Sequence, residues 1–132
     1  DNIVEVAVDG GVDGLILANT TVHRPADLRG RHRGEAGGLS GRPLRAPATA
    51  VLAAAYRLVD GRIPLIGVGG IASGADAVAR IRAGASLVQL YTALIYNGPG
   101  LVATIVADLA ALLAQDGFDS PSQAVGVDAA AG

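Results

Sequence analysis

Three short apolar runs divide the chain and predict the strands of its fold. They cover residues 14–18, 63–67 and 86–90. Hydrophobic and polar positions do not alternate within them, a pattern typical of strands that are buried on both faces. We therefore expect a parallel sheet that is covered by helices.

Apolar positions at helical spacing fill the intervals between these runs. They predict helices over residues 1–11, 47–60, 73–83 and 101–113. Ser73 is a suitable N-cap for the third helix, and Gly84 is a suitable stop. The residues expected to share the packed face of a helix are Ile3, Val6 and Ala7 in the first, Ala75, Val78, Ala79 and Arg82 in the third, and Leu101, Val102, Ile105, Val106, Leu109, Leu112 and Leu113 in the fourth.

This alternation of helices and strands predicts a parallel α/β protein, either doubly wound or a barrel. Three strands cannot close an eight-stranded barrel, and alone they would leave unpaired apolar edges. The chain also begins at Asp1 rather than at Met. We therefore expect a piece of a larger fold. Residues 1–116 would form its α/β domain, and residues 117–132 a loosely docked C-terminal tail with Phe118 and Val125 as anchors.

The composition excludes several kinds of chemistry. The 132 residues carry a net charge of −2 and include no Cys and no Lys. Disulfides, Cys-ligated metals and lysine Schiff bases are therefore excluded, and we expect no metal site. The small charge gives no field that would attract nucleic acid or an anionic membrane. No apolar run approaches the roughly 18 residues of a membrane span.

Polar residues at two predicted strand ends are candidate ligand-binding groups. Asn19 and Thr20 follow the first run, and Tyr91 and Thr92 end the third. An Asn amide suits a planar imide or a carboxylate, although Asn and Thr also end strands for reasons of turn geometry alone. Tyr91 and Thr92 could complete a phosphate site or simply pack on a neighbouring element. In a barrel, the carboxyl ends of the strands face the active site.

Two glycine-rich loops lie beside these strand ends. Residues 37–43 allow backbone N–H groups to approach a flat or anionic ligand, or serve as a flexible connector. Residues 67–74 follow the second run and open a helix, as phosphate-binding loops do, or form a tight turn. The third strand lacks the terminal acidic residue of a dinucleotide site. We therefore favour a barrel-type phosphate site over a site for NAD.

The long link over residues 21–43 is the unusual segment of the chain. It holds His23, His32 and a cluster of arginines. Links of this length are usually functional or mobile. The histidines have no catalytic partner and no metal-ligand spacing, so we expect them to be solvated. Arg24 and Arg42 flank the candidate site.

Together these motifs resemble the quinone-linked class of the dihydroorotate dehydrogenase family. The segments that carry the resemblance are residues 19–21, 37–44, 66–71, 84–92 and 96–99. Their order and spacing match over nearly the whole chain. The resemblance implies a (β/α)8 TIM barrel with FMN at its C-terminal face. This chain would supply the last three βα units, so that residues 1–116 would be a partial FMN-binding domain.

The resemblance also implies roles for individual residues. Asn19 and Thr20 would hold the orotate ring. The residues that would contact FMN are Ala18 and Gly41 through the backbone, and Gly69, Gly70, Tyr91 and Thr92 around the phosphate. The family often has Thr at the position of Ala18, where a backbone contact would survive the change and a hydroxyl contact would not.

The reaction implied by the resemblance is the oxidation of dihydroorotate to orotate in pyrimidine (UMP) biosynthesis, with a quinone as electron acceptor. In this class the catalytic base is a Ser in the earlier half of the protein. A Lys that contacts the flavin, and the helices of the quinone tunnel, also belong to that earlier part. We therefore expect no catalytic base here, Ser40 included, and no activity from this chain alone. The resemblance further implies a peripheral membrane protein on the cytoplasmic side of a bacterial membrane, attached through a region outside the chain.

Two alternatives remain open at this point. Another phosphate-binding TIM-barrel enzyme would explain residues 67–74, but not the combination of Asn19 and Thr20 with residues 37–41. A half-barrel that binds a phosphate ligand or a partner without catalysis would explain the absence of a base.

Overall fold

A computed structural model describes residues 2–129 as a layered α/β fold. Its elements, in chain order, are α1 (Asn2–Asp9), β1 (Leu15–Leu17), the 3-10 turn η1 (Arg42–Leu44), α2 (Arg45–Val59), β2 (Leu65–Val68), α3 (Gly74–Arg82), β3 (Leu87–Gln89), α4 (Thr92–Asn97), α5 (Gly100–Gln115) and α6 (Pro121–Ala124). The predicted alternation of helices and strands is confirmed. The short elements η1, α4 and α6 are additions to it.

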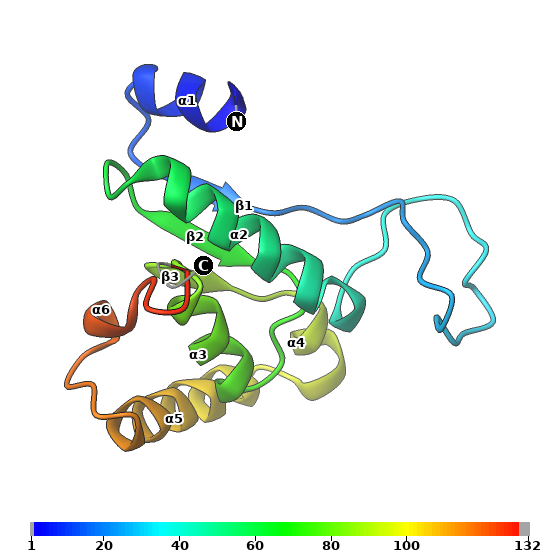
Figure 1. Ribbon diagram of the computed structural model, residues 1–132. Helices are drawn as coiled ribbons and strands as arrows, with labels where there is room; N and C mark the ends of the chain where they lie inside the picture. The colour runs from blue at the N-terminus through cyan, green and yellow to red at the C-terminus, as the bar shows by residue number, and fades with distance from the viewer. Residues whose placement is uncertain (1, 130–132) are drawn as a thin grey trace.

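The three strands form one parallel sheet in the order β1-β2-β3. Ile16 pairs with Ile66, and Ile66 pairs with Leu87. Because the strands are parallel, their carboxyl ends lie along one edge of the sheet. Figure 1 shows the long loop after β1, the start of α2 and helix α4 gathered at that end of the molecule. The candidate ligand-binding groups of all three strands therefore belong to one region.

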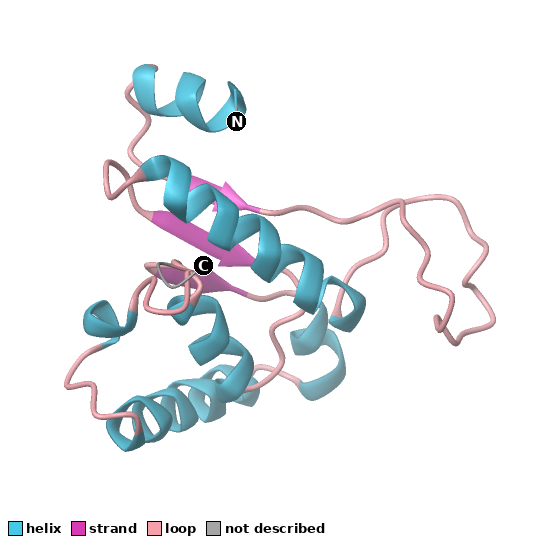
Figure 2. Ribbon diagram, in the orientation of Figure 1, coloured by secondary structure: helices cyan, strands magenta, loops and turns pink. Residues whose placement is uncertain are grey.

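The helices cover one face of the sheet (Figure 2). Leu52 and Val59 of α2 pack with Leu65 of β2 in the main core cluster. The opposite face leaves Ile16 56% exposed and Leu87 62% exposed. The expectation that the strands are buried on both faces is therefore wrong for the described residues 2–129. A bare apolar face of this kind faces the interior in a closed barrel, where side chains from all strands fill it.

The first helix presents a different face to the core from the predicted one. Val4 is buried in the main cluster and Val8 packs against it, whereas Ile3 is 81% exposed and Val6 is 63% exposed. The prediction that Ile3 and Val6 point inward is therefore wrong. Apolar residues lie on both sides of this short helix, so periodicity alone does not distinguish the two faces.

Helix α3 also differs from its predicted stripe. Ser73 caps it as expected, because its Oγ accepts a hydrogen bond from the Asp76 N–H at 3.2 Å. Ala75 and Ala79 are exposed, whereas Asp76 and Arg80 are buried. The predicted stripe is therefore wrong at Ala75 and Ala79, whereas Val78 is buried as expected. The two charges can be buried because both have partners inside the protein. Without such partners, burial of a charge is strongly unfavourable.

Helix α5 packs mainly against α3 and follows its predicted face only in part. Ile105 and Leu113 are buried, and Leu109 packs against the clusters that contain them. Val102 is 45% exposed and Val106 is 58% exposed at the edge of this face, so the prediction that these two residues are packed is wrong. No helix within residues 2–129 is both long enough and apolar enough to cross a membrane.

The C-terminal segment is firmly docked along residues 118–129. The Gly126 N–H donates to the Ile81 carbonyl at 3.1 Å, and the Asp128 N–H donates to the Arg82 carbonyl at 3.0 Å. Ala124 is fully buried, and Phe118 and Val125 pack in the same cluster as anchors. The expectation of a loosely docked tail is therefore wrong for these residues. Residues 130–132 of that tail lie outside the described residues.

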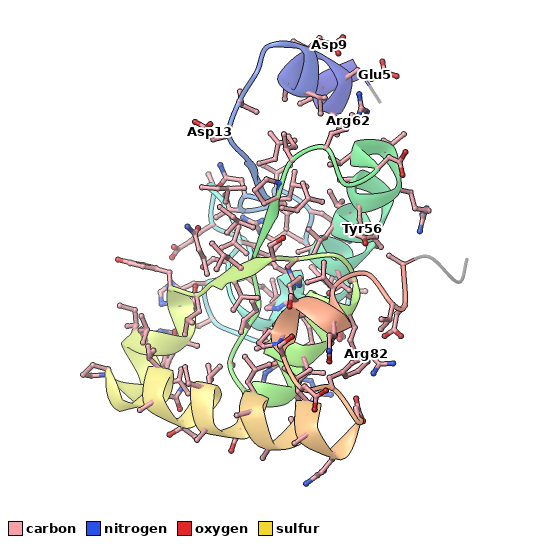
Figure 3. All side chains as sticks on the ribbon, turned by 90° about the vertical axis from the view of Figure 1, so that its left-hand side faces the viewer. Glu5, Asp9, Asp13, Tyr56, Arg62 and Arg82 are labelled. Carbon is pink, nitrogen blue, oxygen red and sulfur yellow. The ribbon has the colours of Figure 1, made fainter. Side chains whose placement is uncertain are left out.

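Arg82 is the polar centre of this docking. Its guanidinium forms ion pairs with Asp116 and Asp128, each at 2.8 Å. The hydrogen bond to Asp128 raises the pKa of Arg82 above its ordinary value, and the same bond lowers the pKa of Asp128. Figure 3 shows Arg82 beside the C-terminal segment and Arg62 far from it, toward the N-terminal helix.

Candidate functional site

A cavity of about 560 Å³ opens at the carboxyl ends of the strands. Three segments that are distant in the sequence build it: the loop before α2, the turn between β2 and α3, and the start of α4. The predicted cofactor residues that line it are Gly41, Gly69, Gly70, Tyr91 and Thr92. The fold thus brings together five of the six residues predicted for cofactor binding.

Gly69 and Gly70 form the turn between β2 and α3. Their φ angles of +104° and +76° are in the region that favours glycine. A Cβ atom on Gly70 would lie 2.6 Å from the Arg45 nitrogen at the start of α2. The backbone of this turn can therefore pass close to α2 only without a side chain at residue 70.

The loop over residues 37–41 contacts the residues that follow β1 and those that follow β3. Thr21 and Leu39 form an antiparallel bridge, with N···O distances of 3.1 and 2.7 Å. The Thr92 hydroxyl donates to the Ser40 hydroxyl at 3.0 Å. A Cβ on Gly41 would lie 3.0 Å from the Thr92 side chain. The loop is therefore held at both ends and is part of the site rather than a free connector.

The residues after β1 do not line this cavity. Ala18 is half-buried, and Asn19 and Thr20 are exposed at the end of the strand. The Thr20 N–H donates to the Asn19 Oδ1 at 2.7 Å, which orients the amide. The Thr20 side chain lies directly against Gly38, where a Cβ would approach its hydroxyl to 2.1 Å. The predicted substrate residues are thus connected to the cavity through the loop that contains Gly38.

A buried polar network lies beneath the turn at Gly69 and Gly70. The Arg80 guanidinium donates to the Val68 and Gly69 carbonyls at 2.9 and 2.7 Å, and burial lowers its pKa while Asp76 acts in the opposite direction. The Asp76 carboxylate pairs with Arg45 at 2.7 Å and accepts the Ala72 N–H at 3.0 Å. Sequence reasoning missed all three charged residues.

One sequence signal could have found part of this network. Ser73 and Asp76 have the spacing of a capping box, in which the acidic residue reaches back to the backbone before the helix. Asp76 does so here, at the Ala72 N–H. No sequence signal marks Arg80, because its partners are backbone carbonyls of the turn.

The arginines and histidines of the long loop have mainly local partners. Arg24 donates to the carbonyls of Thr21, Glu35 and Gly37 at 3.2, 3.0 and 2.8 Å, so it closes the base of the loop and does not line the cavity. His32 is exposed and pairs with Glu35. Among residues 2–129, no three His, Asp or Glu side chains come together as a metal site would require.

The lining of the cavity fits an anionic ligand that also has a flat apolar part. Arg29 and Arg42 lie in the wall, and within the described part of the chain no carboxylate does. Ser40 and Thr92 offer hydroxyls beside the glycine turn. The apolar lining residues are Leu28, Leu39, Pro43, Leu44, Ile71, Ala72, Leu90 and Ala93. Exposed backbone N–H groups beside a cationic rim are the usual chemistry of a phosphate site.

A family model described as dihydroorotate dehydrogenase matches residues 1–113. Among curated relatives, the dihydroorotate dehydrogenase (quinone) of Azorhizobium caulinodans is 64% identical over 126 residues, which cover 96% of this chain and 35% of the relative. The mitochondrial dihydroorotate dehydrogenase (quinone) of Mus musculus is 53% identical over 97% of this chain and 32% of the relative. The chain therefore spans about a third of the length of these relatives.

The fold is also similar to solved structures of this kind of protein. The ligand-free DHODH of Eimeria tenella matches with a TM-score of 0.93 and 44% sequence identity, over 96% of this chain and 35% of that chain. The three-stranded parallel sheet with its helices on one face is consistent with part of a TIM barrel, as the sequence predicted. These similarities favour the dihydroorotate dehydrogenase hypothesis over an unrelated phosphate-binding barrel.

Proposed function

The chain belongs to the dihydroorotate dehydrogenase family, and on that basis we propose that the full-length protein oxidises dihydroorotate to orotate, with FMN as cofactor and a quinone as electron acceptor. The observation that carries the proposal is the cavity at the strand ends, where the glycine turn and the start of α4 meet. Relatives that carry the word quinone in their names support the choice of acceptor.

The phosphate of FMN is assigned to the turn and to the start of α4. Gly69 and Gly70 offer backbone N–H groups there without side chains that would obstruct the phosphate. Tyr91 and Thr92 offer the first N–H groups of α4, and Thr92 adds a hydroxyl. The first N–H groups of a helix have no partner within the helix and carry a partial positive charge, so they stabilise an anion.

The remaining cofactor contacts are assigned to Gly41 and Ala18. Gly41 has a φ angle of +80° and lies against Thr92 at the cavity wall. Its missing side chain lets a flat ring approach the backbone. Ala18 would contribute through its backbone at the end of β1. When bound, FMN supplies an acceptor that can take a hydride from the substrate and can be reoxidised by a quinone.

Asn19 and Thr20 are assigned to the substrate. Dihydroorotate carries an imide and a carboxylate, for which an amide provides a donor and an acceptor in one side chain. Asn19 Oδ1 is held by the Thr20 N–H, and the Asn19 side chain is exposed where it can meet a ligand. These residues orient the substrate but cannot remove its proton, because neither is a base near neutral pH.

No residue of this chain is proposed as the catalytic base. The Ser40 hydroxyl accepts a hydrogen bond from Thr92 and lies in the loop before α2, where it stabilises the cavity wall. The proton acceptor, the quinone entrance and any membrane contact on the cytoplasmic side of a bacterial membrane are assigned to parts of the protein outside this chain. Within it, residues 1–116 would serve as the partial FMN-binding barrel domain and residues 117–132 as its C-terminal tail.

The flavin itself reports the proposed reaction. The full-length protein should be yellow when purified, should lose its flavin absorbance when dihydroorotate is added without oxygen, and should regain it when a quinone is added. Asn19→Ala should keep the bound flavin and slow the bleaching by about tenfold or more, because a lost hydrogen bond to a polar substrate removes on the order of 1–3 kcal/mol. A flavin that dihydroorotate does not bleach would disprove the proposal.

A further inference from the structure

Arg80 is the largest fully buried side chain of the described residues, with 1% of its surface exposed. It extends from α3 toward the sheet and passes Gly67 of β2. A Cβ atom on Gly67 would lie 2.4 Å from Arg80 Cγ and 2.8 Å from Cδ. The glycine therefore makes room for the arginine stem, and strand and helix together admit a buried cation at this position.

The hydrogen bonds of Arg80 all go to backbone carbonyls. Nη1 donates to Val68 at 2.9 Å, and Nη2 donates to Gly69 at 2.7 Å and to Arg45 at 3.3 Å. These carbonyls belong to the glycine turn and to the start of α2, the two segments that meet beneath the cavity. One guanidinium therefore connects two walls of the proposed phosphate site.

The hydrogen bonds of Arg80 also fix the direction of the neighbouring N–H groups, because each peptide unit is planar. In a planar trans peptide, the carbonyl of one residue and the N–H of the next point in opposite directions. Because Arg80 binds the Val68 and Gly69 carbonyls, the N–H groups of Gly69 and Gly70 point away from Arg80. Both glycines line the cavity, and none of the hydrogen bonds among residues 2–129 uses the Gly70 N–H.

Asp76 stabilises the other end of the turn. Asp76 binds Arg45 through two contacts, at 2.7 and 3.0 Å, and also accepts the Ala72 N–H at 3.0 Å. Gly70 packs against the Arg45 backbone between these two supports. The turn is therefore fixed by Arg80 on its β2 side and by Asp76 on its α3 side.

We propose that Arg80 is a positioning residue for the cofactor phosphate: from beneath the turn it orients the Gly69 and Gly70 peptide groups toward the cavity. The proposal rests on the FMN phosphate site proposed above. Arg80 does not line the cavity itself, so it acts through the backbone. Its positive charge also lies beneath the turn, where it favours an anion. A role in stability alone would affect every ligand of the site equally, whereas positioning acts selectively on the phosphate.

Riboflavin separates these two roles, because it has the ring system of FMN and lacks the phosphate. The apoprotein of the full-length protein is titrated with FMN and with riboflavin, and the quenching of flavin fluorescence gives both dissociation constants. Arg80→Met should weaken FMN binding by about tenfold or more, since hydrogen bonds from charged groups are among the stronger ones. Riboflavin binding should change by less than about twofold.

Arg82→Met is the matched control on the same helix. The side-chain hydrogen bonds of Arg82 go to Asp116 and Asp128 rather than to the turn, so its loss should lower the melting temperature and leave the ratio of the two dissociation constants unchanged. If Arg80→Met does not fold, Arg80→Lys and Asp76→Asn are measured in the same way. Lys keeps the charge but not the fork geometry, so a partial loss of FMN selectivity is expected.

The outcomes distinguish this inference from the proposed function. If the original protein binds FMN no more tightly than riboflavin, the phosphate site itself is refuted, and the role of Arg80 with it. If the original protein prefers FMN and the folded Arg80 variants keep the same preference, the positioning role alone is refuted. Equal weakening of FMN and riboflavin would mean that Arg80 only stabilises the fold.

Discussion

At the scale of single residues, glycine controls how closely segments can approach one another at the strand ends. Gly70 combines a positive φ angle with direct contact to the Arg45 backbone. Gly61, between α2 and β2, has a similar φ angle of +73°, but a Cβ atom there would meet no other atom within 4 Å. A comparison of alanine substitutions at the two glycines therefore separates the cost of a positive φ angle from the cost of a steric clash.

Gly70→Ala should lower the free energy of unfolding by about 1–3 kcal/mol more than Gly61→Ala does, because only the former forces atoms together. Both should share a cost of about 1 kcal/mol for a side chain at positive φ. Urea unfolding of the full-length protein measures the difference. Equal destabilisation by the two substitutions would show that the close approach of Gly70 to Arg45 is absent in solution.

Residue identity predicted the exposed part of the site better than the buried part. Gly69, Gly70 and Thr92 were singled out because their residue types and their place at strand ends indicate phosphate chemistry, and all three line the cavity. That they bind phosphate stays a prediction. Asp76 and Arg80 were missed because periodicity rules assign charged residues to the solvent face of a helix. Their burial depends on partners that the fold brings together, such as the Gly69 carbonyl for Arg80.

At the scale of elements, the long apolar runs and helices were predictable and the short pieces were not. β2 and α5 lie within about two residues of their predicted bounds, because a continuous apolar run and a seven-residue stripe are strong signals. The turn η1 and helices α4 and α6 are three to six residues long. Elements of that length span fewer than two helical turns and show no repeated apolar spacing, so packing rather than pattern determines them.

Docking of the C-terminal segment should depend on pH through Asp128. The hydrogen bond from Arg82 holds the pKa of Asp128 below its ordinary value of 3.8. A lowered pKa in the folded state stabilises docking above pH 3.8, and this contribution disappears as the pH falls from there through the lower folded value. Residues 118–129 should therefore loosen in acid before the rest of the fold does.

Hydrogen exchange of the Gly126 and Asp128 amides measures this loosening. Their protection factors should be high at about pH 6 and clearly lower at about pH 3. Asp128→Asn should lower protection at the higher pH and remove most of the difference between the two. Asp119→Asn, in an exposed residue of the same segment, should change neither value. Protection that is unaffected by acid would contradict the role of the Arg82 ion pair.

At the scale of the whole molecule, the sheet determines both where the candidate site lies and which apolar face stays exposed. Three parallel strands place every candidate group at one edge, and the helices cover only one face of the sheet. Ile16 and Leu87 remain exposed on the other face. The parallel α/β sheet could be predicted from the alternation of elements, and its place in a barrel from the resemblance to the family. The cavity could not, because it depends on how the loop over residues 37–41 folds back onto Thr92.

We propose that this part of the protein holds the phosphate of FMN between the turn after β2 and the start of α4. The most direct test is a crystal structure of the full-length protein with FMN. We predict phosphate oxygens at about 3 Å from the backbone nitrogens of Gly70 and Thr92, with the Arg80 contacts to Val68 and Gly69 intact beneath them. FMN bound with its phosphate outside this cavity, while Gly69 and Gly70 make no contact with it, would contradict this placement of the phosphate.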